Sequence, residues 1–92
     1  MLIKYINRTT RFKHTYKSLP QHIRDDFDKK ITLFVQNPRT PQLRTHKLKG
    51  KLQGCLAFCL RDGFRVLFDF ASNDTVNLID IGPHNKYRVW GK

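Results

Sequence analysis

The chain has 92 residues, enough for one domain with a single modest hydrophobic core, and we predict one domain over residues 1–92. Its 39% of hydrophobic and 12% of aromatic residues exclude an intrinsically disordered chain. Eighteen Lys and Arg residues against seven acidic residues, all Asp, give a net charge of +11. This excess favours nucleic acid, anionic lipid or an acidic protein as partner, although a solvated basic surface would give the same count.

Targeting and redox signals point to a cytosolic protein. No apolar run approaches the roughly 20 residues of a membrane helix, and the N-terminal stretch lacks the features of a secretory signal. On one strand, Cys55 and Cys59 would be about 13 Å apart, too far for a disulfide bond. We therefore expect reduced thiols and, with no second cysteine pair, no zinc site.

The first half of the chain predicts a strand followed by two helices. Leu2–Ile6 alternates like a strand. A first helix follows, with a Thr or Asn of residues 7–10 as its cap and an apolar face at i, i+4 and i+7 made by Phe12, Tyr16 and Leu19. Pro20 opens a second helix at Gln21–Gln36, whose apolar stripe consists of Ile23, Phe27, Ile31 and Phe34. Asn37-Pro38 ends it.

The second half predicts strands. After a linker at residues 39–44, the short basic strand Thr45–Leu52 leads into a hairpin that turns at Asp62-Gly63, and Val76–Ile81 forms the last strand. We predict an α+β fold of order β-α-α-β-β-β. The N-terminal helical hairpin packs on one face of a mainly antiparallel four-stranded sheet.

Alternation along the hairpin separates two faces of the sheet. The large side chains of Phe64, Val66, Phe68 and Phe70 must pack on the helices to leave water. Arg65 then points to the other face, beside the small residues Cys55, Ala57 and Cys59. An arginine beside small residues predicts a binding site there.

The residues of this region suit RNA cleavage without a metal. Histidine transfers protons near neutral pH, and arginine holds a phosphate with two hydrogen bonds. The candidate catalytic residues are His46, Arg65, His84 and Tyr87, and the candidate RNA-binding residues are Lys47, Lys49 and Lys51. Each also has a structural interpretation: a surface histidine, an Arg65–Asp69 pair, a core tyrosine or a solvated strand edge. His14 and His22 occupy polar helical positions and are predicted to lie on the surface.

Four passages resemble the RelE/ParE superfamily of type II toxins, especially its YafQ-like and RelE-like mRNA interferases. They are FKHTYKSLPQHI, NPRTPQLRTHKLKG, GFRVLF and IDIGPHNKY. The resemblance implies a ribosome-dependent endoribonuclease without cofactor or metal, which cuts mRNA in the A site by attack of the 2′-hydroxyl and inhibits translation. It also implies a cytoplasmic protein whose partners are the ribosome, mRNA and a cognate antitoxin with an acidic, partly disordered segment, and no membrane.

The resemblance assigns roles position by position. His46 and Lys49 match the histidine and lysine of the HxLKG passage. Arg65 matches an arginine that binds phosphate in many members. His84 matches the histidine of the IGxH motif, and Tyr87 matches a late aromatic residue. The chain departs from some YafQ-like members at Cys59, where they carry histidine, and at Gly63, where they carry an acidic residue. Which histidine is base and which is acid stays open. The alternatives are a ParE-type gyrase inhibitor without nuclease activity and a non-toxic basic RNA-binding domain.

Overall fold

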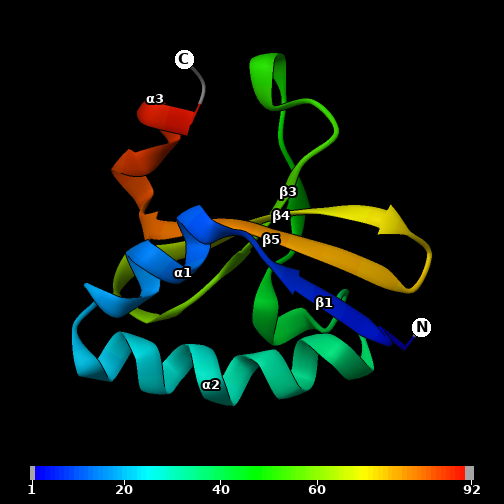
Figure 1. The fold of residues 1–92 in the computed structure, drawn as a ribbon, viewed down its shortest axis with the longest axis horizontal. Helices are drawn as coiled ribbons and strands as arrows, with labels where there is room; N and C mark the ends of the chain where they lie inside the picture. Colours follow the sequence, from blue (N-terminus) through cyan, green and yellow to red (C-terminus); the bar gives the residue numbers. More distant parts are fainter. Residues whose placement is uncertain (1, 91–92) are drawn as a thin grey trace.

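A five-stranded sheet forms the centre of the computed structural model, which describes residues 2–90 (Figure 1). The elements in chain order are β1 (Tyr5–Arg8), α1 (Thr10–Lys17), α2 (Gln21–Gln36), β2 (His46–Lys47), β3 (Leu56–Cys59), β4 (Phe64–Ser72), β5 (Thr75–Pro83) and α3 (Tyr87–Trp90). The strand order is β1-β5-β4-β3-β2, with β1 parallel to β5 and the other neighbours antiparallel.

The predicted fold class is confirmed, but the sheet has five strands instead of the predicted four. Strand β2 lies within the predicted basic strand Thr45–Leu52, is only two residues long and pairs His46 with Ala57 and Lys47 with Leu56. The rest of the predicted basic strand turns away into a 3-10 helix at Gly50–Leu52. Helix α2 has the predicted bounds, whereas α3 was not predicted because a four-residue helix carries too little periodicity to be recognised.

Local chemistry explains the helix starts. The Thr9 side chain accepts a hydrogen bond of 3.1 Å from the Phe12 N–H and caps α1. Pro20 directly precedes α2, where its fixed φ angle suits the first turn. No helix among residues 2–90 is long and apolar enough to cross a membrane.

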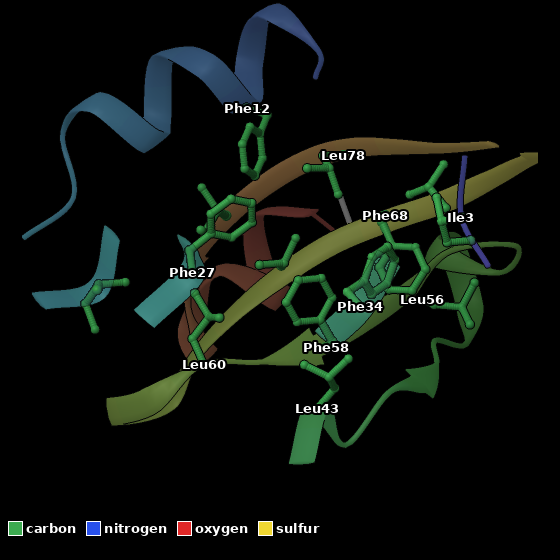
Figure 2. Packing of buried hydrophobic residues seen from close by; sticks show 14 of the residues in the cluster. Ile3, Phe12, Phe27, Phe34, Leu43, Leu56, Phe58, Leu60, Phe68 and Leu78 are labelled. Carbon is green, nitrogen blue, oxygen red and sulfur yellow. The ribbon is translucent and has the colours of Figure 1, made fainter. Parts of the chain in front are cut away.

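Both N-terminal helices bury their apolar stripes against the same face of the sheet, as predicted (Figure 2). The rings of Phe34 and Phe58 stack at 4.9 Å between centroids, and Phe68 meets Phe34 edge-on at the same distance. The fully buried side chains of this core include Phe12, Ile23, Phe27, Leu43, Val66, Val76, Leu78 and Ile81. Phe64 and Phe70, at the two ends of β4, are only partly buried.

A bulge in β5 decides which residues of this strand face the helices. Leu67 pairs with Asp80 but Phe68 pairs with Leu78, so Ile79 is the extra residue. Consequently Leu78 and Ile81 both enter the core, while Asp80 lies with Leu67 on the other face. On that second face we find Arg65 as predicted, paired across the sheet with Cys59 and Gly82.

Asp26 of α2 holds the turn between β3 and β4. Its Oδ2 accepts hydrogen bonds from the Arg61 backbone N–H at 2.8 Å and from Lys30 Nζ at 3.0 Å. Burial alone would raise the pKa of Asp26, but the bonds from Arg61 and Lys30 outweigh it and lower the pKa below its ordinary value. The carboxylate therefore favours the folded state.

We predict that Phe34→Ala lowers the free energy of unfolding by about 3–5 kcal/mol, because it leaves a cavity between Phe58 and Phe68. Urea denaturation measures the change. Tyr5→Ala serves as the control, since Tyr5 is 63% exposed and its removal is expected to cost less than about 0.5 kcal/mol. Equal losses in the two variants would contradict the described core.

We predict that Asp26→Asn removes part of the pH dependence of stability. A lowered folded-state pKa stabilises the protein above the unfolded value of 3.8, and this contribution is lost as the pH falls through the folded-state pKa. Wild type should therefore be more stable than the variant near pH 6, and the two should converge once the pH has fallen below the folded-state pKa of Asp26. A gap in urea midpoint that stays constant over this range would refute the assignment.

Candidate active site

Two predicted histidines, His46 and His84, meet around the ring of Tyr87, the first residue of α3. His46 Nε2, on β2, lies 3.2 Å from the Tyr87 hydroxyl. The His84 ring, just beyond β5, meets Tyr87 edge-on at 5.1 Å between centroids, and the His46 ring does so at 6.5 Å. Residues 46, 84 and 87 are thus brought together from two distant parts of the chain.

The hydrogen bonds of His46 determine its tautomer. Nδ1 lies 2.9 Å from the Arg44 carbonyl oxygen, which can only accept, so Nδ1 carries a proton. In the neutral ring Nε2 is then the basic nitrogen, and the Tyr87 hydroxyl donates to it. The proton-accepting atom of His46 is therefore directed toward Tyr87.

Arg44 has a left-handed backbone conformation, with φ 51° and ψ 39°. Such a conformation costs a non-glycine residue about 1–2 kcal/mol. It directs the Arg44 carbonyl onto the His46 ring. Strain of this kind is concentrated at functional sites, and sequence analysis, which placed Arg44 in a linker, gave no sign of it.

Arg65 faces the same side of the sheet and has no acidic partner. Its Nη1 donates to the Phe64 carbonyl at 3.3 Å, and its Nε is buried without a hydrogen-bond partner. Asp69 instead accepts a hydrogen bond from Asn77. No Arg65–Asp69 pair exists among the ion pairs of residues 2–90, so the guanidinium charge is available to an anion.

Gly82 leaves room for a lysine side chain beside Arg65. A Cβ atom at this position would lie 2.5 Å from Lys86 Cγ, so the Lys86 side chain packs directly over the glycine backbone. Since Gly82 pairs with Arg65 across the sheet, Lys86 brings a second cation to the same region. Sequence analysis identified the glycine motif but not this lysine.

Tyr87 stays a neutral phenol. Burial raises the pKa of its hydroxyl, and the positive charge of Arg65, which acts in the opposite direction, does not cancel the effect. A protonated hydroxyl can donate to His46 or to a substrate oxygen over the whole physiological pH range.

Asp80 anchors the short helix that carries Tyr87. This fully buried carboxylate accepts hydrogen bonds from Trp90 Nε1 at 2.7 Å and from the Ile81 N–H at 2.8 Å, and it pairs with Arg11 Nε at 3.0 Å. Trp90 in turn packs edge-on against Tyr87 at 5.3 Å between centroids. Asp80 is thus a positioning residue, and a lone Asp within the mostly apolar Val76–Ile81 stretch was the available signal.

The three lysines lie apart from this cluster. Strand alternation places Lys47 on the opposite side of β2 from His46. Lys47 and Lys49 line a hollow of about 620 Å³ with Leu48, Gln53 and Cys55, and Lys51 is exposed in the adjoining 3-10 helix. No described contact joins any of the three to His46, Arg65, His84 or Tyr87.

The remaining candidates are peripheral. His14 and His22 are exposed, as predicted, and His22 lies 3.0 Å from Asp62 Oδ2. Cys55 and Cys59 are free, half-buried thiols. Within residues 2–90 no group of three or more His, Cys, Asp or Glu side chains is arranged to hold a metal ion.

Known structures share this architecture, although no family model and no curated protein sequence matches the chain. YafQ from E. coli strain BL21(DE3) superposes with a TM-score of 0.75 at 11% identity, covering 91% of this chain and 97% of that one. A mutant of the E. coli toxin RelE in the free state gives 0.72 at 20% identity, covering 97% and 92%. The chain has the RelE/YafQ toxin fold. The predicted resemblance is confirmed at this level.

An archaeal member of the RelE-like fold has been crystallised as a complex. The RelE–RelB complex from Pyrococcus horikoshii OT3 matches with a TM-score of 0.68 at 15% identity, covering 94% of this chain and 99% of that one. Identities this low establish a common RelE-like architecture, and functional conclusions depend on the site itself.

We predict that Asp80→Ala lowers the free energy of unfolding by about 3 kcal/mol, because Trp90 Nε1 and Arg11 lose their buried acceptor. Trp90, the only tryptophan, should then show red-shifted fluorescence as α3 loosens. Asp69→Ala, a change on the same strand pair, should leave the emission unchanged. An unshifted spectrum in Asp80→Ala would disprove the anchoring role.

Proposed function

We propose that this protein is the toxin of a type II toxin–antitoxin module and an endoribonuclease that cleaves mRNA in the ribosomal A site. The observation that carries the proposal is the convergence of His46, His84 and Tyr87 on the sheet face that also presents the unpaired Arg65. Two proton-transfer groups beside a free guanidinium are the components of metal-independent phosphodiester cleavage.

In the first half of the proposed reaction, His46 acts as base. Nε2 takes the proton of the substrate 2′-hydroxyl, and the Arg44 carbonyl stabilises the resulting imidazolium through Nδ1. The 2′-oxygen then forms a bond to the phosphorus atom. Before this step Nε2 must exchange the Tyr87 hydroxyl for the substrate hydroxyl, which a neutral phenol permits by rotating its O–H bond.

In the second half His84 acts as acid. As the bond between phosphorus and the 5′-oxygen breaks, protonated His84 gives its proton to that oxygen, which leaves as a 5′-hydroxyl. The other product carries a 2′,3′-cyclic phosphate. Because His84 is exposed on a 3-10 helix at the end of β5, a substrate chain can reach it from solvent.

Arg65 stabilises the pentacoordinate phosphate. Its fork of N–H donors matches two non-bridging oxygens, and the charge that develops on them is neutralised without a metal. Lys86, which packs over Gly82 beside Arg65, adds positive potential. Lys47, Lys49 and Lys51 would contact more distant phosphates, and the net charge of +11 would attract ribosomal RNA.

A protein partner follows from the same charge. RelE of P. horikoshii was crystallised with RelB. We propose that this chain likewise binds a cognate antitoxin. An acidic, partly disordered antitoxin segment would cover the basic surface and block access to the site in the cytoplasm.

We predict that His84→Ala and His46→Ala each reduce mRNA cleavage by about 10²–10⁴-fold, the contribution of a general acid or base. Primer extension on a translated mRNA after brief induction measures the cuts, and His14→Ala, which changes an exposed histidine of α1, serves as control. Circular dichroism should show unchanged folding in all three variants.

Other outcomes would favour the alternatives. Intact mRNA with arrested growth and DNA damage signalling would replace the proposal with gyrase inhibition of the ParE type. Intact mRNA with normal growth would leave a basic RNA-binding domain. Cleavage that both histidine variants retain in full would overturn the site assignment.

A further inference from the structure

A second hollow, of about 380 Å³, opens at the end of the β3–β4 hairpin. Its polar wall is made by Lys30, Gln42, Arg44, Arg61, Asp62 and Arg65. The volume lies near the lower limit of small-ligand sites, so it is large enough for one phosphate and its sugar. None of Lys30, Gln42, Arg44 and Arg61 was a candidate in the sequence.

The charges of this hollow are unbalanced. Four cations face one carboxylate, Asp62, whose Oδ2 lies 3.8 Å from Arg61 Nε and 3.0 Å from His22. Lys30 is already paired with Asp26. Arg44 and Arg65 have no acidic partner among residues 2–90, and Arg65 Nε is buried without any hydrogen bond. Such guanidinium groups favour an anion that can accept two hydrogen bonds from the same side chain.

The hollow adjoins the candidate active site through two shared residues. The Arg44 carbonyl holds His46 Nδ1 while the Arg44 side chain lines the hollow. Arg65 likewise lines the hollow, and its charge acts on Tyr87. An anion bound here would therefore lie next to the reacting phosphate. The left-handed conformation of Arg44 makes both contacts possible from one residue.

We propose that this hollow is a subsite for the RNA phosphodiester adjacent to the one that is cleaved, with Arg44 and Arg61 as its specific ligands. The inference rests on the proposed function, since it places the neighbouring nucleotide of the same substrate. Single-stranded RNA is the favoured ligand because a continuous chain would occupy the active site and the hollow together through Arg65. An acidic peptide has no such reason to span both.

The test measures binding of short 2′-O-methyl oligonucleotides, which cannot be cleaved because the attacking hydroxyl is blocked. A dinucleotide carries one phosphodiester, and two trinucleotides extend it by one phosphodiester at the 5′ or the 3′ end. For wild type we expect one of the two extensions to tighten binding by about tenfold at low salt, the contribution of a charge-assisted contact. Titration calorimetry or NMR chemical shifts report the affinities.

Arg61→Gln should abolish this gain while leaving dinucleotide binding nearly unchanged, and Arg44→Gln should abolish the gain as well. Arg61→Gln is the cleaner variant, because the Arg61 backbone N–H keeps its bond to Asp26 and the turn stays in place. Arg39→Gln, which removes an exposed arginine that does not line the hollow, is the matched control and should retain the gain.

Three results would overturn the inference: no gain from either extension in wild type, a gain that persists in Arg61→Gln and Arg44→Gln, or an equal loss in Arg39→Gln. If these arginines instead controlled binding of an acidic peptide and not of the oligonucleotides, the hollow would belong to a protein partner. The proposed function is tested separately by cleavage. A gain in affinity from the longer oligonucleotide without mRNA cleavage would reject the proposed nuclease activity and retain the subsite. Cleavage without this gain in affinity would reject only the subsite.

Discussion

The alternation of side chains along β4 is the constraint on which the molecule depends. Val66 and Phe68 must reach the helices, where the rings of Phe34 and Phe58 complete the core. Because successive residues of a strand point to opposite faces, this burial forces Arg65 onto the second face. The hydrophobic core therefore determines where the charge of Arg65 is presented, and α1 and α2, on one side of the sheet, support the candidate site on the other (Figure 1).

On the second face of the sheet, the buried Asp80 carboxylate holds α3 in place. The bulge at Ile79 keeps Leu78 and Ile81 in the core yet places Asp80 on the opposite side. There Asp80 binds Trp90, whose ring packs against Tyr87. A helix as short as α3 is not stable alone. We see the buried carboxylate as the element that keeps Tyr87 within hydrogen-bonding distance of His46.

Charge and geometry together support the proposal that RNA is the substrate. A net charge of +11 attracts any polyanion, and by itself does not distinguish RNA from an acidic protein. The distinction comes from the two histidines around a neutral tyrosine, and from arginines left without acidic partners. These groups have the proton-transfer capacity that 2′-hydroxyl attack requires, and a purely binding surface would not need them.

The sequence by itself determined the fold class, the bounds of α2, the division of the hairpin into two faces, and the candidates His46, Arg65, His84 and Tyr87. These follow from periodicity, turn residues and side-chain chemistry, which are local properties. Only the tertiary structure decided that β2 is a two-residue strand, that Lys47 faces away from His46, and that Arg44, Trp90 and Asp80 support the site. These contacts join residues that are distant in the sequence, such as His46 and Tyr87, which are 41 positions apart. They also depend on the β5 bulge and on the left-handed conformation of Arg44, which no local sequence pattern predicts.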